Sequence, residues 1–102
     1  MIRDPATLPI LLSLLRLPNP FARQAILQAV RTINSPQSAP SLLELLDDPH
    51  ADNAFIAMQA LIELAGGGAI DWVPPLPVFR ENRSYYAARC REWWQAERQP
   101  QQ

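Results

Sequence analysis

The chain has 102 residues, of which 48% are hydrophobic, and it carries a formal net charge of −1 at neutral pH. This length fits one domain or a short series of repeats, and the hydrophobic content excludes an intrinsically disordered chain. The low net charge argues against a dedicated nucleic-acid-binding protein, whose surface is normally basic. No apolar run reaches the ~20 residues that span a bilayer, so we expect no membrane insertion.

Residues 4–34 predict a pair of helices joined by a tight turn. Apolar side chains recur with helical spacing over residues 8–15, which indicates a helix with one buried face. The Leu-Pro-Asn-Pro sequence at residues 17–20 ends this helix, and Asn19 is placed to cap the next one. We expect the second helix to cover residues 20–33 and to bury one set of apolar side chains. These are Ala22, Ala25, Ile26, Ala29, Val30 and Ile33.

The same plan recurs at an offset of 31 residues, in residues 35–65. Prolines, paired leucines and a Gln-Ala-aliphatic segment return at this spacing: Pro5, Pro9, Pro18, Leu11, Leu12 and Gln28 recur as Pro36, Pro40, Pro49, Leu42, Leu43 and Gln59. We expect Ser38 to cap a short helix over residues 39–47. A longer helix should follow over residues 51–65 and end at the three glycines that begin with Gly66. A period of this length is typical of supersecondary units that pack in series, and it points to binding rather than to chemistry.

The two units resemble HEAT-like repeats, a family of α-solenoids built from antiparallel helix pairs. In the first unit the resemblance is carried by Leu11, Leu12, Leu14, Leu15, Pro18, Ala22, Arg23, Ala25, Ala29 and Val30. In the second unit it is carried by Leu42, Leu43, Leu45, Leu46, Asp47, Asp48, Pro49, Ala57, Ala60 and Leu61. The resemblance implies an all-α fold of two stacked antiparallel hairpins and a non-catalytic role in protein–protein interaction or as a scaffold. The family often carries an arginine early in the second helix, where this chain has Arg23 and then Ala54.

Residues 66–102 do not form a third complete unit. Pro74, Pro75 and Pro77 predict an extended segment over residues 69–79. A last helix is expected over residues 82–97, with one apolar side made of Tyr86, Cys90, Trp93 and Trp94. We therefore interpret the chain as a single helical repeat domain with a Pro/Trp-rich C-terminal cap.

Positions at which the two units differ in polarity indicate surfaces with different neighbours. In the second helix of each unit, Gln24, Leu27 and Arg31 correspond to Phe55, Met58 and Ile62. The later helix thus gains an apolar stripe and is expected to be buried on two sides. We expect the C-terminal third of the chain, including Trp72 and Phe79, to cover this stripe as a lid. A ligand groove lined by the same residues is the alternative.

The first helices differ in the opposite sense, because Ile10, Leu14 and Leu17 correspond to Ser41, Leu45 and Asp48. We call Ile10, Leu14 and Leu17 the N-terminal stripe. Solenoid ends normally carry a polar outer face, so this stripe is a candidate protein-binding surface. The stripe could be covered in four ways: by a protein partner, by a second copy in a homodimer, by preceding repeats of a longer chain, or by residues 1–2 folding back. A second candidate is the polar surface of the second helices: Gln24, Gln28, Arg31, Gln59 and Glu63.

The sequence offers little for catalysis, and we expect neither enzyme activity nor a cofactor or metal. The one histidine, His50, lies in a turn where capping or exposure to solvent is the expected role. The one cysteine, Cys90, excludes an intrachain disulfide, fits a small core residue, and agrees with a cytoplasmic protein.

The acidic residues near the second turn, including Asp47 and Asp48, are expected to lie in a solvated turn. Pairing of these residues with arginines is the alternative.

A nucleic-acid-binding helical module remains an alternative function. Arginines alternate with aromatic residues in the last helix, as they do in some single-strand binders: Arg83, Arg89 and Arg91 interleave with Tyr85, Tyr86, Trp93 and Trp94. Nearby glutamates largely offset this charge. An open face carrying these arginines would be required for such a function.

Overall fold

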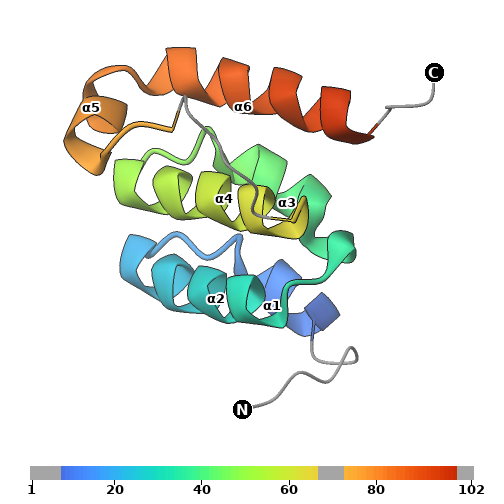
Figure 1. Cartoon of the computed structure of the whole chain (residues 1–102). Helices are drawn as coiled ribbons and strands as arrows, with labels where there is room; N and C mark the ends of the chain where they lie inside the picture. Colours follow the sequence, from blue (N-terminus) through green and yellow to red (C-terminus); the bar gives the residue numbers. More distant parts are fainter. Residues whose placement is uncertain (1–7, 67–72, 99–102) are drawn as a thin grey trace.

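The computed structural model of the chain describes residues 8–66 and 73–98, and these residues contain helices but no strand (Figure 1). The helices are α1 (Leu8–Leu14), α2 (Pro20–Ile33), α3 (Ala39–Leu45), α4 (Ala51–Leu64), α5 (Leu76–Glu81) and α6 (Arg83–Arg98), with a 3₁₀ turn, η2 (Pro36–Ser38), before α3. The all-helical fold expected from the sequence is confirmed for this part of the chain.

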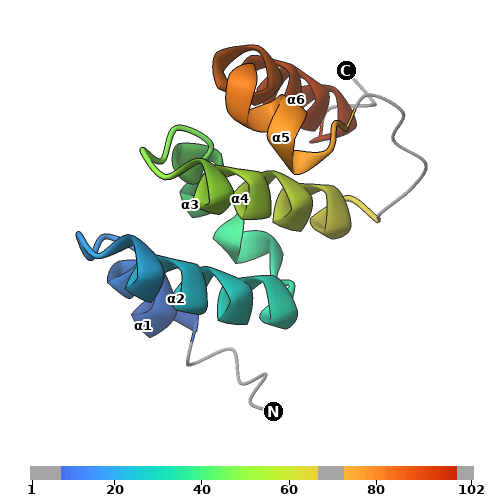
Figure 2. The same ribbon diagram turned by 90° about the vertical axis from the view of Figure 1, so that its left-hand side faces the viewer.

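Two helical hairpins follow one another along the molecule. Helix α1 packs on α2, α3 packs on α4, and α2 lies beside α4 in both views (Figures 1 and 2). The core lies between these helices, and its large side chains that are at most 1% exposed include Leu27, Val30, Leu42, Met58 and Leu61. The long second helices therefore join the two hairpins.

Short-range interactions set the helix boundaries. The Asn19 side chain accepts hydrogen bonds from the backbone N–H groups of Phe21 (2.8 Å) and Ala22 (3.1 Å), which confirms Asn19 as the cap of α2. Asn34 ends the same helix in the left-handed conformation, with φ 56°. Gly66 has φ 106° just after α4, where the missing side chain avoids strain. The two glycines that follow lie outside the described residues.

The predicted cap at Ser38 is wrong. Ser38 has helical dihedral angles in the 3₁₀ turn, so its hydroxyl donates backwards to the Ser35 carbonyl oxygen at 2.6 Å. Ser35 is the residue whose side chain accepts a backbone N–H, that of Gln37 at 3.3 Å. The cap thus lies three residues earlier, because the 3₁₀ turn precedes α3.

The prediction of an extended segment over residues 69–79 is also wrong where α5 begins. Pro77 occupies the second position of this helix, where a missing N–H removes no intrahelical hydrogen bond. A proline near the start of a helix is therefore compatible with α5, although the sequence predicts an extended segment there. Residues 69–72, including Trp72, lie outside the described residues.

The buried face of α2 differs from the predicted one at two positions. Leu27, which the repeat comparison placed beside the polar Gln24 and Arg31, is fully buried, whereas Ala25 is exposed. Helix α2 contacts α1 on one side and α4 on another, so its buried arc is wider than that of a one-sided amphipathic helix. Leu27 and its counterpart Met58 are therefore both core residues.

The last two helices pack against α4. Phe79 of α5 is fully buried, with its ring centroid 5.3 Å from that of Phe55 and 6.3 Å from that of Tyr86. Cys90 and Trp94 of α6 are also buried. Because the chain's own Phe79 lies against Phe55, the contacts favour a lid over a ligand groove at this stripe.

The position of Cys90 leads to a prediction about its reactivity. Burial raises the pKa of the Cys90 thiol from the ordinary 9.0 to about 12, against the opposing effect of the Arg91 charge. Only the thiolate reacts with alkylating reagents, so iodoacetamide should modify Cys90 at neutral pH only through unfolding. The labelling rate, measured by mass spectrometry as denaturant is added, should follow the unfolded fraction. Fast labelling of the native protein would contradict this packing of α6.

The same pKa shift gives the direction of a pH effect on stability. Above pH 9 the unfolded chain loses the Cys90 proton, whereas the native chain keeps it until the pH nears about 12. The unfolded state then binds fewer protons, so this group's contribution to stability falls as the pH rises through that interval.

Candidate protein-binding surfaces

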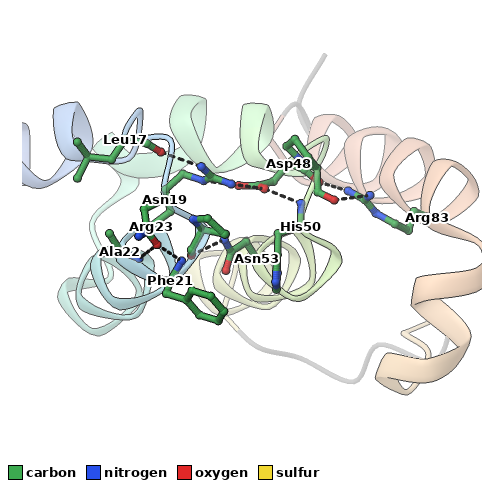
Figure 3. Close-up of polar contacts among 11 residues, drawn as sticks. Leu17, Asn19, Phe21, Ala22, Arg23, Asp48, His50, Asn53 and Arg83 are labelled. Carbon is green, nitrogen blue, oxygen red and sulfur yellow. Dashed lines mark hydrogen bonds and ion pairs between the residues drawn. The ribbon is translucent and has the colours of Figure 1, made fainter.

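An ion pair joins the two hairpins at their turns (Figure 3). The Arg23 guanidinium donates through Nε and Nη2 to the two carboxylate oxygens of Asp48, both at 2.9 Å. Its Nη1 also donates to the Leu17 carbonyl oxygen at 2.7 Å, and the His50 backbone N–H donates to Asp48 at 2.8 Å. The Asp48 side chain is 1% exposed and that of Arg23 12%.

The expectation that the acidic residues occupy a solvated turn is therefore wrong for Asp48. A buried carboxylate persists because the guanidinium and the backbone N–H replace its lost hydration. Its neighbour Asp47 has a side chain that is 71% exposed and pairs with Arg91 at 2.8 Å. Pairing with arginines, the alternative interpretation, is thus correct for both aspartates.

Arg83, the first residue of α6, reaches the turn of the second hairpin. It donates to the carbonyl oxygens of Asp48 and Pro49. Asp48 is the repeat counterpart of Leu17, whose carbonyl accepts from Arg23 in the first hairpin. Arg83 therefore gives the second hairpin the turn contact that an arginine in place of Ala54 would otherwise make.

A shallow depression of about 290 Å³ lies between the two turns, lined by Pro18, Pro20, Arg23, Pro49 and His50. Close to it, the Phe21 ring packs edge-on against His50, with centroids 6.1 Å apart, and is 72% exposed (Figure 3). Phe21 was not among the surface residues predicted from the sequence. Its repeat counterpart is Asp52, so the same comparison of polarity could have found it.

The polar surface proposed from the sequence is partly occupied by contacts between the hairpins. Arg31 of α2 donates to both Glu63 carboxylate oxygens, at 2.9 and 2.6 Å, and to Gln59 at 3.4 Å. The hydrogen bond to Glu63 raises the Arg31 pKa, and burial partly opposes it. Gln28 is exposed and Gln24 is half-buried. Three of the five predicted residues thus bind one another.

The N-terminal stripe lies on the surface. Ile10 is 61% exposed, Leu14 37% and Leu17 38%. Their counterparts in the second hairpin are covered to a greater extent: Ser41 and Leu45 are half-buried, and Asp48 is buried. The two repeats therefore differ in exposure, as they do in polarity, at equivalent positions.

Two of the α6 arginines that would have to lie on an open face, Arg83 and Arg91, are bound to other parts of the chain. Arg83 is bound to carbonyl oxygens of the second turn, and Arg91 donates to the Leu43 carbonyl oxygen and to Asp47. These contacts give no support to the nucleic-acid-binding alternative. In the part of the chain that the structure describes, no group of metal-binding side chains converges and no helix has the length and apolar character of a membrane span.

Two similar helical hairpins, joined through their second helices and through an arginine–aspartate pair at the turns, define a helical-repeat protein. A sequence model of HEAT repeats matches residues 1–63. The chain belongs to the HEAT-repeat family, as the sequence resemblance implied. No significant match was found among curated proteins or among solved structures. HEAT repeats generally mediate protein–protein interactions or act as scaffolds, and the family is typically non-catalytic.

Proposed function

We propose that this protein is a non-catalytic, cytoplasmic binding module that holds another protein molecule at its N-terminal stripe. The observation that carries the proposal is the difference between equivalent positions. Ile10 and Leu14 are exposed at the end of the first hairpin, whereas Ser41 and Leu45 of the second are half-buried. Exposed aliphatic side chains grouped on one helix are typical of an interaction surface.

The polar surface is the weaker candidate for binding. A partner there would compete with the contacts of Arg31 to Glu63 and Gln59 that already connect α2 and α4. Binding at the N-terminal stripe would not compete with hydrogen bonds of this kind, because the side chains of the stripe are apolar and exposed. Burying them removes apolar surface from water, which is the main favourable contribution to protein association.

Photochemical crosslinking in living cells tests this function. With p-benzoylphenylalanine in place of Leu14, we expect a crosslinked product of defined mass, which mass spectrometry can identify. Val78 of α5 is the matched control, because it is an aliphatic residue of similar exposure, 40% against 37%. A crosslink at position 78 but none at position 14 would contradict the proposal, as would equal, diffuse labelling at both positions.

A further inference from the structure

The chemistry of the partner at the N-terminal stripe follows from the charges of the first hairpin. We propose that the stripe binds an amphipathic helix of another protein, whose apolar face covers Leu14 and Leu17 and whose flanking carboxylate pairs with Arg16. This inference rests on the proposed function and names the kind of partner that the same surface fits.

Arg16 lies between two residues of the stripe, in the helical turn that follows α1. The Leu17 N–H donates to the Leu14 carbonyl oxygen at 3.1 Å, and the Arg16 N–H donates to the Ser13 carbonyl oxygen at 3.4 Å. Arg16 is exposed, and its side chain makes no hydrogen bond or ion pair with another residue in the part of the chain that the structure describes. A partner that covers the two leucines therefore comes within reach of its guanidinium.

The other two arginines of the first hairpin are already neutralised. Residues 5–43 contain three arginines and no acidic residue. Arg23 and Arg31 both pair with carboxylates of the second hairpin, at 2.9 and 2.6 Å. Arg16 is the one arginine of this segment for which the described residues supply no carboxylate, and Asp4 lies outside them. The charge that a partner has to match at this end of the molecule is therefore positive.

The second hairpin shows how the equivalent position is used within the chain. Asp47 is the repeat counterpart of Arg16, so the sign of the charge is reversed between the two units. The Asp47 carboxylate accepts from Arg91 at 2.8 Å, and Arg91 belongs to α6, a helix that packs on the second hairpin. The corresponding contact at Arg16 is a carboxylate carried by a helix of the partner.

The spacing of the stripe suits a helical partner. Ile10, Leu14 and Leu17 are separated by four and three residues, which places them in a row along α1 and the turn after it. Such a row forms a ridge that fits into the groove between side chains of a second helix. An apolar face on that helix covers the row, and charges at its margin select the partner.

Two helical model peptides of about 18 residues test the proposal. Both carry the same leucine face, flanked by glutamates in one peptide and by lysines in the other, and nuclear magnetic resonance titration of the 102-residue chain measures their dissociation constants. We expect the glutamate peptide to bind at least about fivefold more tightly, because its carboxylates meet Arg16. The net charge of the whole chain, −1, would by itself favour the lysine peptide.

Charge reversal at one position separates a local contact from the overall charge. Arg16→Glu should reverse the preference, so that the lysine peptide binds more tightly, and Arg16→Gln should abolish it. Arg80→Glu is the matched control, because the Arg80 side chain is 52% exposed and the substitution changes the net charge equally. This control should keep the preference for glutamate. Circular dichroism identifies which variants remain folded.

The proposal is overturned if neither peptide binds, or if the parent chain binds both equally well. It is also overturned if Arg80→Glu shifts the preference as far as a folded Arg16→Glu variant does. Crosslinking in cells separates this failure from that of the proposed function. A crosslinked protein at position 14, combined with no preference for the glutamate peptide, would contradict the acidic helix but keep a protein partner at the stripe.

Discussion

Replacing Asp48 with alanine should destabilise the protein by about 3 kcal/mol, because this carboxylate neutralises a largely buried guanidinium. The Asp48→Ala variant leaves Arg23, with 12% of its side chain exposed, without its two charged acceptors. It also removes the acceptor of the His50 backbone N–H. Small domains have a net stability of ~5–15 kcal/mol, so the loss is a large part of the total.

Thermal unfolding followed by circular dichroism measures this effect, and the fall in Tm should be at least ~12 °C for a chain of this length. Asp47→Ala is the matched control, because Asp47 is the neighbouring residue and also pairs with an arginine. Its side chain is 71% exposed, so we expect a loss of less than ~1 kcal/mol. Equal effects of the two substitutions would show that the Arg23–Asp48 pair does not stabilise the contact between the hairpins.

The second large effect is expected at Phe79, which attaches the last two helices to α4. Phe79→Ala removes a fully buried ring that contacts Phe55 and Tyr86. A truncation of this kind costs about 3–5 kcal/mol in a well-packed core. The loss should appear first in α5 and α6, because Phe79 belongs to α5 and its ring lies against Phe55 of α4 and Tyr86 of α6.

Amide hydrogen exchange resolves this loss by segment. In Phe79→Ala we expect faster exchange over α5 and α6, with α2 little changed. Val78→Ala is the control, because Val78 is the preceding residue but 40% exposed. If exchange in α2 accelerates as much as in α6, the C-terminal helices and the hairpins form one cooperative unit.

The sequence was sufficient to predict the repeated architecture. The offset of 31 residues aligns prolines and paired leucines that define both hairpins, and Asn19 was correctly predicted as a cap. Comparison of the repeats also marked Ile10 and Leu17, which stand where the second unit has Ser41 and Asp48, and both are exposed. That they bind a protein stays a prediction. Phe21, whose repeat counterpart is Asp52, shows the same difference in polarity but was overlooked.

Other features depend on contacts that a single segment does not encode. Leu27 is buried because α2 has neighbours on two sides, which its own periodicity does not reveal. The contact of Arg83 joins the start of α6 to a turn more than thirty residues earlier. At the sequence level Ala54 appeared to interrupt the arginine pattern, yet an arginine from another helix reaches the same turn.

These contacts make the two ends of the molecule different. At the C-terminal end, α5 and α6 pack on α4, with Phe79 against Phe55, and Arg83 donates to carbonyl oxygens of the second turn. At the N-terminal end, Ile10 and Leu14 remain exposed among the residues that the structure describes. This difference supports the proposal that the N-terminal stripe binds another protein.

The central claim is that this apolar end contacts another protein molecule, and crosslinking from repeat-equivalent positions tests it most directly. The photoreactive residue is placed at Ile10 in one variant and at its counterpart Ser41 in the other. We predict an intermolecular crosslink from position 10 and none from position 41, which lies half-buried in the second hairpin. Intermolecular crosslinks from position 41 but none from position 10 would contradict the account.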